Sequence, residues 1–200
     1  DNRMVHPIGD KGHAYGAQTQ SLWNGIVGRM EIRPIAEKHI ENVRVFPELD
    51  GTVKVEINGA LDGKITAMVG DSTNSSSVKD SDSTSLSLKV KEPTLWSEFS
   101  PKTYQLKVTL TDSTGKVLDS HSTRFGFRKV SRQGNQLLIN GSPAFMRGNL
   151  ECAVFPLTGH PPVTVEGWRK VWQVYKDHHL NHARFHSWCP PEAAFIAADE

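Results

Sequence analysis

Basic and imidazole side chains alternate along one short stretch of the chain. His182, Arg184 and His186 occupy every second position of a segment that reads NHARFHSW. Successive side chains of a β-strand point to opposite faces, so this spacing predicts three polar side chains on one face of a strand. Imidazole and guanidinium groups in that position can donate hydrogen bonds to the oxygen atoms of a ligand.

A second polar set precedes this strand. Arg147 and Asn149 share one phase of another predicted strand, and Glu151 follows in the loop after it. For the arginines of both sets, a structural ion pair with a carboxylate is at least as good an interpretation as direct contact with a ligand. Glu151 fits a hydroxyl contact or a solvated loop carboxylate equally well. Trp188 fits stacking on the face of a ligand or packing in a core.

The histidines of this region raise the question of a metal site. His178, His179, His182 and His186 match no tetrahedral zinc spacing, and the segment passes from a helix end into a strand, so their rings should diverge. His178 and His179 fit better as residues that favour a helix C-terminus. We therefore expect no metal and no cofactor.

The elements that would position these residues follow a strand–helix–strand–helix order. The sequence predicts a pair of strands around Asn140-Gly141 and a buried strand at 144–149. A helix capped by Thr164 should follow, with its aromatic residues in the core, and then the strand LNHARFH and a helix that starts near Pro191. This order is that of a parallel α/β unit. An eight-unit barrel needs about 250 residues, so we expect this chain to be a fragment.

The preceding part of the chain reads as a β-sandwich. About six short alternating runs follow residue 37, with turn signals at Asp50-Gly51, Asp62-Gly63 and Thr114-Gly115. The Ser/Thr/Asp tract at 71–85 is interpreted as an exposed edge strand and loop rather than a linker, because strands resume directly after it. Residues 25–35 also alternate, which predicts a lone half-buried strand whose sheet lies outside the chain.

Composition narrows the classes of function. The 200 residues are 37% hydrophobic and carry 23 Lys+Arg against 22 Asp+Glu, so the basic footprint of a nucleic-acid partner is absent. No apolar run is long enough for a membrane span, and the first residues do not form a signal peptide. Two cysteines, Cys152 and Cys189, make no disulfide framework.

Three stretches together resemble family 2 glycoside hydrolases, the β-galactosidase, β-glucuronidase and β-mannosidase group. TQSLWNGIVGRMEI resembles the end of that family's sugar-binding sandwich. The segment from LWSEFSPKTYQLKV to FGFRKV resembles the end of its immunoglobulin-like domain. NGSPAFMRGNLECAVFPLTGHP and NHARFHSWCPPEAAFIAADE resemble the first two units of its catalytic barrel.

The resemblance implies a mainly β chain, with an immunoglobulin-like β-sandwich followed by the first two β/α units of an incomplete TIM barrel. The implied domains are a sandwich remnant at 1–35, the immunoglobulin-like domain at 36–130 and the start of the barrel at 131–200. It also implies a retaining exo-acting glycosidase that hydrolyses carbohydrates. Family members of this kind are often exported, so the resemblance implies the periplasm or the extracellular space. The implied substrate-binding residues are Arg147, Asn149, Glu151, Arg184, His186 and Trp188.

The family's two catalytic glutamates lie on later barrel strands, so the resemblance implies that this fragment is inactive by itself. Glu192 and Glu200 belong to a helix, which is the wrong place for them. Leu150 and Cys152 stand where the family often has Asn and His, and HSWCPP replaces its usual Ser-His-Tyr-Pro, so the sugar specificity stays open. Two other hypotheses also stay open: a non-catalytic carbohydrate-binding or scaffolding module, and a sandwich that only spaces two domains.

Overall fold

A computed structural model describes residues 26, 28–186 and 188–200. The chain divides into two compact units, and one of them runs from Arg33 to Ala144. The other contains Phe145–Glu200 and the described residues up to Ile32. The division into three domains that the sequence indicates stays a prediction. No helix in the described part of the chain is long and apolar enough to cross a membrane.

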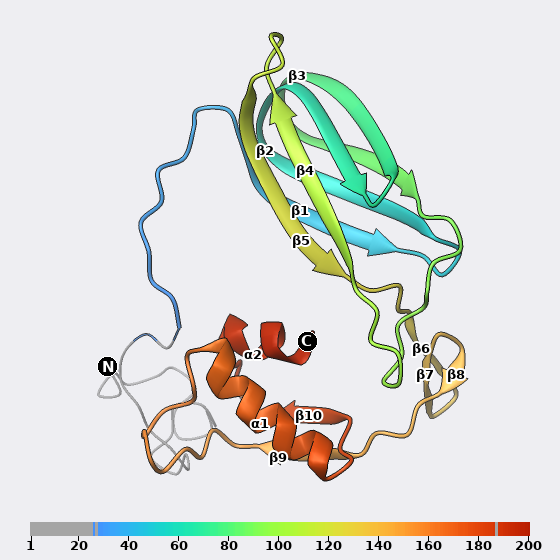
Figure 1. Cartoon of the computed structure of the whole chain (residues 1–200), viewed down its shortest axis with the longest axis vertical. Helices are drawn as coiled ribbons and strands as arrows, with labels where there is room; N and C mark the ends of the chain where they lie inside the picture. Colours follow the sequence, from blue (N-terminus) through green and yellow to red (C-terminus); the bar gives the residue numbers. More distant parts are fainter. Residues whose placement is uncertain (1–25, 27, 187) are drawn as a thin grey trace. The chain divides into compact units, whose positions relative to one another are not determined.

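The unit 33–144 is built on one antiparallel sheet of five strands (Figure 1). Its strands are β1 (His39–Pro47), β2 (Thr52–Val69), β3 (Ser72–Lys89), β4 (Tyr104–Thr111) and β5 (Val117–Phe125). The alternation of apolar and polar residues sets the two faces. Leu106, Val108 and Leu110 of β4 are fully buried, whereas Gln105 and Lys107 are exposed. The predicted β pattern is therefore confirmed.

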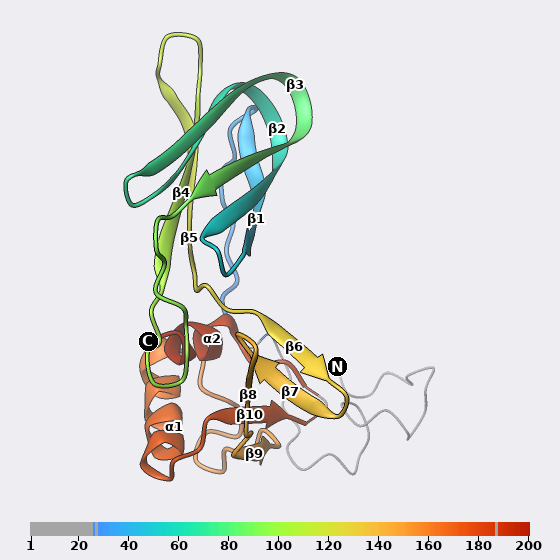
Figure 2. The same ribbon diagram turned by 90° about the vertical axis from the view of Figure 1, so that its right-hand side faces the viewer.

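The sheet curls because β2 and β3 are long and bend together (Figure 2). β3 pairs with β2 along nearly its whole length, while β1 pairs with the first half of β2 and β4 with the second half. The β2–β3 register shifts between Asn58 and Gly63, as it does where a strand bulges. Across the curl, the amide of Ile40 on β1 donates to the Asp119 carboxylate on β5 at 2.8 Å.

The prediction of a turn at Asp62-Gly63 is wrong. Both residues lie inside β2, and Gly63 has a φ of +138°. A Cβ at Gly63 would lie 2.2 Å from the Thr111 carbonyl oxygen on β4, so only glycine fits this close approach. An Asp-Gly pair is typical of a hairpin turn, but a left-handed glycine serves a bulge equally well.

Bending turns the inner face of the sheet into a closed apolar core. Its members come from β1, β2, β3 and β4, and from the segment after β5. The buried side chains are Ile40, Val53, Val55, Ile57, Leu61, Ile65, Ala67, Val69, Leu86, Leu88, Leu106, Val108, Leu110 and Phe127. This single cluster holds the whole curled sheet together.

Residues 72–85 lie inside β3 and form the predicted exposed edge strand, but the loop predicted in the same tract is wrong, because the strand continues through it. Most side chains of β3 are exposed, and β3 pairs with no described strand other than β2. Its two ends are brought together by the curl. The Asn74 side chain donates to the Ser87 carbonyl at 2.8 Å, and the Lys89 amide donates to the Ser72 hydroxyl at 3.2 Å. Side chains thus satisfy edge groups that would otherwise invite another strand.

A small three-stranded sheet ends this unit. β6 (Val130–Gln133), β7 (Gln136–Ile139) and β8 (Ser142–Pro143) are antiparallel, and Asn140-Gly141 forms the predicted turn with φ values of +52° and +79°. The Asn140 side chain donates to the Trp96 carbonyl and accepts from the Lys129 amide, both at 2.8 Å. These bonds attach the small sheet to the segment around Trp96.

The other unit has the predicted strand–helix–strand–helix order. β9 (Gly148–Glu151) pairs in parallel with β10 (His182–Phe185), and α1 (Val165–Asp177) connects them. Thr164 caps α1 as predicted, because its hydroxyl accepts from the Gly167 amide. α2 (Glu192–Ala198) follows β10.

Aromatic residues form the core of this unit. Trp168 is fully buried, with Ala193, Ala194 and Ala197 of α2 beside it. The indole N–H groups of Trp168 and Trp172 donate to the carbonyl oxygens of Pro162 and Ala194. The prediction that the aromatic residues of α1 pack inside is confirmed.

Two predicted strands differ from the structure. Residues 28–35 form no strand, and Met30 and Ile32 are largely exposed; alternation alone does not make a strand when no partner backbone pairs with it. The strand expected at 144–149 begins at Gly148, and its Leu150 is 46% exposed. A parallel strand is buried only when sheet and helices cover both of its faces, and here α1 covers one.

Candidate functional site

The carboxyl ends of β9 and β10 bring three of the predicted residues together. The carbonyl oxygen of Glu151 accepts the His186 amide and the Trp188 indole N–H, both at 2.9 Å. Glu151 is the last residue of β9 rather than a loop residue, which corrects the prediction. This edge is where parallel strands with crossover helices place their ligand sites. Glu151, His186 and Trp188 form what we call the strand-end cluster.

Glu151 is half-buried, and its environment favours the protonated form. Burial raises the pKa of its carboxyl above the ordinary value, while the Ala153 amide, which donates to Oε1 at 2.9 Å, partly opposes that shift. The folded chain therefore binds this proton more tightly than the unfolded chain. The contribution of Glu151 to stability is present below the ordinary pKa and is lost as the pH rises through the folded pKa.

The parallel register separates the two polar sets. Asn149 lies opposite Ala183 and Glu151 opposite Phe185, whereas His182 and Arg184 lie opposite Gly148 and Leu150. Directly paired residues share a face of the sheet, so Asn149 and Glu151 lie on the side that carries Phe185. Phe185 packs against Trp168 and Trp172 of α1, which confirms the prediction that it faces the helix.

On that side, Asn149 contacts a helix residue that the sequence did not single out as a site residue. Its side chain donates to the hydroxyl of Tyr175 at 3.3 Å. The pKa of Tyr175 is raised, first by burial and further by the negative charge of Glu151, while the Asn149 contact opposes the shift. Tyr175 was predicted only as a core residue, because helical spacing does not show that its hydroxyl reaches the strand.

The opposite face carries His182 and Arg184, both exposed. The His182 ring lies over Gly148, since a Cβ there would come within 2.2 Å of the ring atom Nδ1. Gly148 thus leaves the space that the imidazole occupies. Arg184 is placed on the same face but two positions further towards the strand-end cluster.

Arg147 lies at the other end of β9. Its Nε donates to the His179 carbonyl oxygen at 2.9 Å, next to the C-cap of α1 at His178. The Asn181 side chain accepts from the Arg147 amide and donates to the Phe145 carbonyl. Arg147 and Asn181 therefore tie the entry of β9 to that of β10, away from the strand-end cluster.

Trp188 has packing partners as well as its hydrogen bond. Its ring lies 5.2 Å from that of Phe185 and 6.3 Å from that of Trp168, centroid to centroid. One part of the indole therefore belongs to the aromatic core, and the N–H fixes it to β9. This geometry holds the loop after β10 against the end of β9.

The residues of the strand-end cluster carry a carboxyl, an imidazole and an indole ring, and the contacts that join them are made by the Glu151 carbonyl oxygen, the His186 backbone amide and the Trp188 indole N–H. Such groups can hydrogen-bond a polyol and cover one of its faces.

Glu192 lies in the first turn of α2, as predicted, but Glu200 lies beyond the end of that helix at Ala198, which corrects the prediction that it belongs to the helix. Glu200 forms an ion pair with Arg169. No group of three or more metal-ligating side chains occurs within the described residues, and both cysteines are free thiols.

Comparison with known proteins gives a consistent result. Residues 38–128 match the model of the glycosyl hydrolases family 2. A β-galactosidase of Alteromonas mediterranea is 26% identical over 211 residues, which cover 90% of this chain and 20% of that protein. A β-galactosidase of Photobacterium profundum is 30% identical over 54% of this chain and 11% of its own length.

Solved structures share the fold. A glycosyl hydrolase family 2 member from Bacteroides cellulosilyticus superposes with a TM-score of 0.68 at 19% identity, covering 82% of this chain and 24% of that one. A β-glucuronidase from Ruminococcus gnavus in complex with D-glucuronic acid gives 0.67 at 19% identity, covering 80% and 28%.

The chain spans about a fifth of the length of the curated relatives that match most of it. The family match and these relatives agree on one family, and the solved structures share its fold. On these grounds, the chain is similar to members of glycoside hydrolase family 2, whose family model it matches over residues 38–128.

Proposed function

We propose that this chain is part of a retaining exo-glycoside hydrolase, in which it contributes to the pocket for a terminal sugar and not the two hydrolytic carboxyls. The observation that carries the proposal is the strand-end cluster: Glu151, His186 and Trp188 meet at the carboxyl ends of two parallel strands. Relatives named β-galactosidase and β-glucuronidase support a carbohydrate substrate.

The proposal assigns a role to each unit. The curled sheet would be the family's immunoglobulin-like domain. The β9–α1–β10–α2 segment would be the first two units of its catalytic barrel, and the residues before 36 a remnant of the sugar-binding sandwich. The strand–helix order and the parallel pairing of β9 with β10 support the barrel assignment. Export to the periplasm or the extracellular space is part of the same proposal.

The retaining mechanism sets what else the whole protein needs. Two carboxyl groups must lie about 5–5.5 Å apart on either side of the glycosidic bond, one as acid/base and one as nucleophile. Glu151 contacts its own loop through Ala153, and no second described carboxyl belongs to the strand-end cluster. We assign the catalytic pair to barrel strands beyond Glu200, and to Glu151 the binding of a sugar hydroxyl.

Kinetics of the longer gene product would test this assignment. On a panel of aryl glycosides, Glu151→Gln should lower kcat/KM for the preferred sugar about tenfold or more, as expected when a hydrogen bond to a charged group is lost. Glu166→Gln is the matched control, because Glu166 is an exposed carboxylate in the first turn of α1. The 200-residue chain alone should release no aryl alcohol.

Turnover by the 200-residue chain alone would contradict the absence of the catalytic pair. Equal kinetics for the two variants would exclude Glu151 from the sugar pocket. A longer gene product without two further carboxylates at strand ends would favour the carbohydrate-binding module instead.

A further inference from the structure

The outward face of the curled sheet differs between its two halves. On the half where β2 pairs with β4, the register aligns Ser75, Thr66, Thr109 and Ser120 in one row across β3, β2, β4 and β5. Neighbouring strands are about 4.8 Å apart, so short hydroxyl side chains recur at that spacing. We call this half the hydroxyl face.

Three cations cross the hydroxyl face diagonally. Lys64 lies on β2, Lys107 on β4 and Arg124 on β5, and all three are exposed. On β4, Lys64 is paired with Thr111 and Arg124 is paired with Gln105. Lys107 lies between these two partners, four positions from Thr111 and two positions from Gln105. At about 3.4 Å per residue, the stripe extends about 20 Å along the strands. A charge distribution of this length fits an extended polymer better than a single ion.

The cations of this stripe have no local neutralisation. Within the part of the chain that the structure describes, none of Lys64, Lys107 and Arg124 forms an ion pair, and the outward positions of the paired segments carry no carboxylate. Cations that face solvent without partners create a positive potential that attracts anions.

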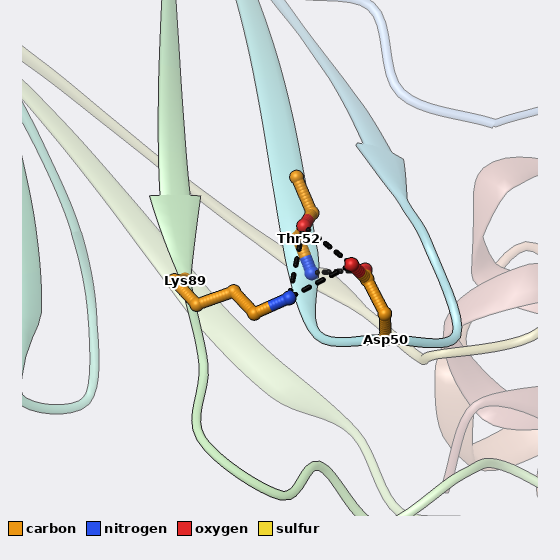
Figure 3. A network of polar contacts seen from close by, with 3 residues as sticks. All are labelled: Asp50, Thr52 and Lys89. Carbon is orange, nitrogen blue, oxygen red and sulfur yellow. Dashed lines mark hydrogen bonds and ion pairs between the residues drawn. The ribbon is translucent and has the colours of Figure 1, made fainter.

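The other half of the same sheet provides an internal contrast. There, Lys54 pairs with Glu56 at 2.7 Å and Lys89 pairs with Asp50 at 2.8 Å. Figure 3 shows the second pair, in which Thr52 also contacts both partners. Lys89 and the hydrogen bonds from Thr52 lower the pKa of Asp50 to about 2. Each of these lysines is thus matched by a carboxylate, and this half attracts anions less.

We propose that the hydroxyl face binds an extended acidic polysaccharide. The cations would contact carboxylates of the polymer, and the serine and threonine hydroxyls would exchange hydrogen bonds with its sugar hydroxyls. A nucleic acid fits less well. Single strands are held by aromatic side chains that stack on bases, and the outward positions of this half carry none. The proposal is independent of the strand-end cluster and of any hydrolysis.

Binding of polygalacturonate by the 200-residue chain tests the proposal, measured by calorimetry or affinity electrophoresis at low salt. The Lys64→Gln/Lys107→Gln/Arg124→Gln variant should bind at least tenfold more weakly. The matched control is Arg44→Gln/Lys54→Gln/Lys89→Gln on the other half, which removes the same charge, from +1 to −2. It should lose less than threefold. Binding should weaken as salt rises, and neutral dextran should not bind.

The result that would overturn the proposal is equal loss in both variants, because net charge alone would then explain the binding. Tighter binding of duplex DNA than of polygalacturonate would overturn it as well, as would no binding of the polymer by the unchanged chain. All substituted side chains are exposed, and a thermal melt of each variant confirms that the fold is retained.

Discussion

Asn140 combines a left-handed backbone with two side-chain hydrogen bonds, which makes it informative at the scale of one residue. Its φ of +52° is unusual for a residue with a side chain, and its amide group joins Trp96 to Lys129. The Arg128 guanidinium lies over the Trp96 ring, 4.6 Å from its centroid. The sequence predicted the turn here, because Asn-Gly is the typical pair for it. It did not predict the bonds to Trp96, which lies 44 positions earlier.

Asn140→Gly should therefore lower the free energy of unfolding by about 1–2 kcal/mol. Glycine tolerates the positive φ, so the loss reports the two hydrogen bonds rather than strain. The measurement is urea denaturation followed by circular dichroism. Asn135→Gly in the preceding turn is the control, because Asn135 is exposed and in the same small sheet. A similar loss in both variants would show that the bonds to Trp96 and Lys129 contribute nothing.

At the scale of elements, the strands were predictable and their bends were not. Alternation of apolar and polar residues specifies which face of β4 is buried, and it did so correctly. It does not specify a partner, which is why residues 28–35 were misread as a strand. Nor does it distinguish a turn from a bulge at Gly63, since both use a left-handed glycine. The two ends of β3 approach each other only because the strand bends, so no local sequence pattern predicts the contacts between them.

Ser72→Ala should remove a hydrogen bond that joins the two ends of β3. The Lys89 amide loses its acceptor, the Ser72 hydroxyl, so we expect its hydrogen exchange to accelerate several-fold, because exchange follows local opening. The neighbouring amide of Val90 bonds to the Gly51 carbonyl at 2.9 Å and should stay protected. Ser85→Ala, on the outward face opposite Glu56, serves as the control substitution. An unchanged Lys89 exchange rate would mean that the hydroxyl does not close the edge.

At the scale of the whole molecule, the sequence did not reveal the register of the parallel strands or the size of each core. The residues of the strand-end cluster were all singled out in advance from their types and positions. Which side chains of β9 and β10 share a face was not predictable. Whether Asn149 shares a face with Ala183 or with His182 depends on how the two strands align. The amount of core differs as well. Among the described residues, the core cluster of the curled sheet has fourteen buried hydrophobic side chains, whereas the core cluster of residues 145–200, which we call the aromatic unit, has four.

This imbalance predicts that the two units unfold separately. Buried apolar area is the main source of stability, so the aromatic unit should unfold at a lower urea concentration than the curled sheet. Five tryptophans occur in the chain, and Trp168, Trp172 and Trp188 all belong to the aromatic unit. In a Trp23→Phe/Trp96→Phe background, indole fluorescence therefore reports that unit, while far-ultraviolet circular dichroism reports mostly the sheet. The fluorescence midpoint should precede the dichroism midpoint, whereas coincident transitions would mean that the chain unfolds as one cooperative body.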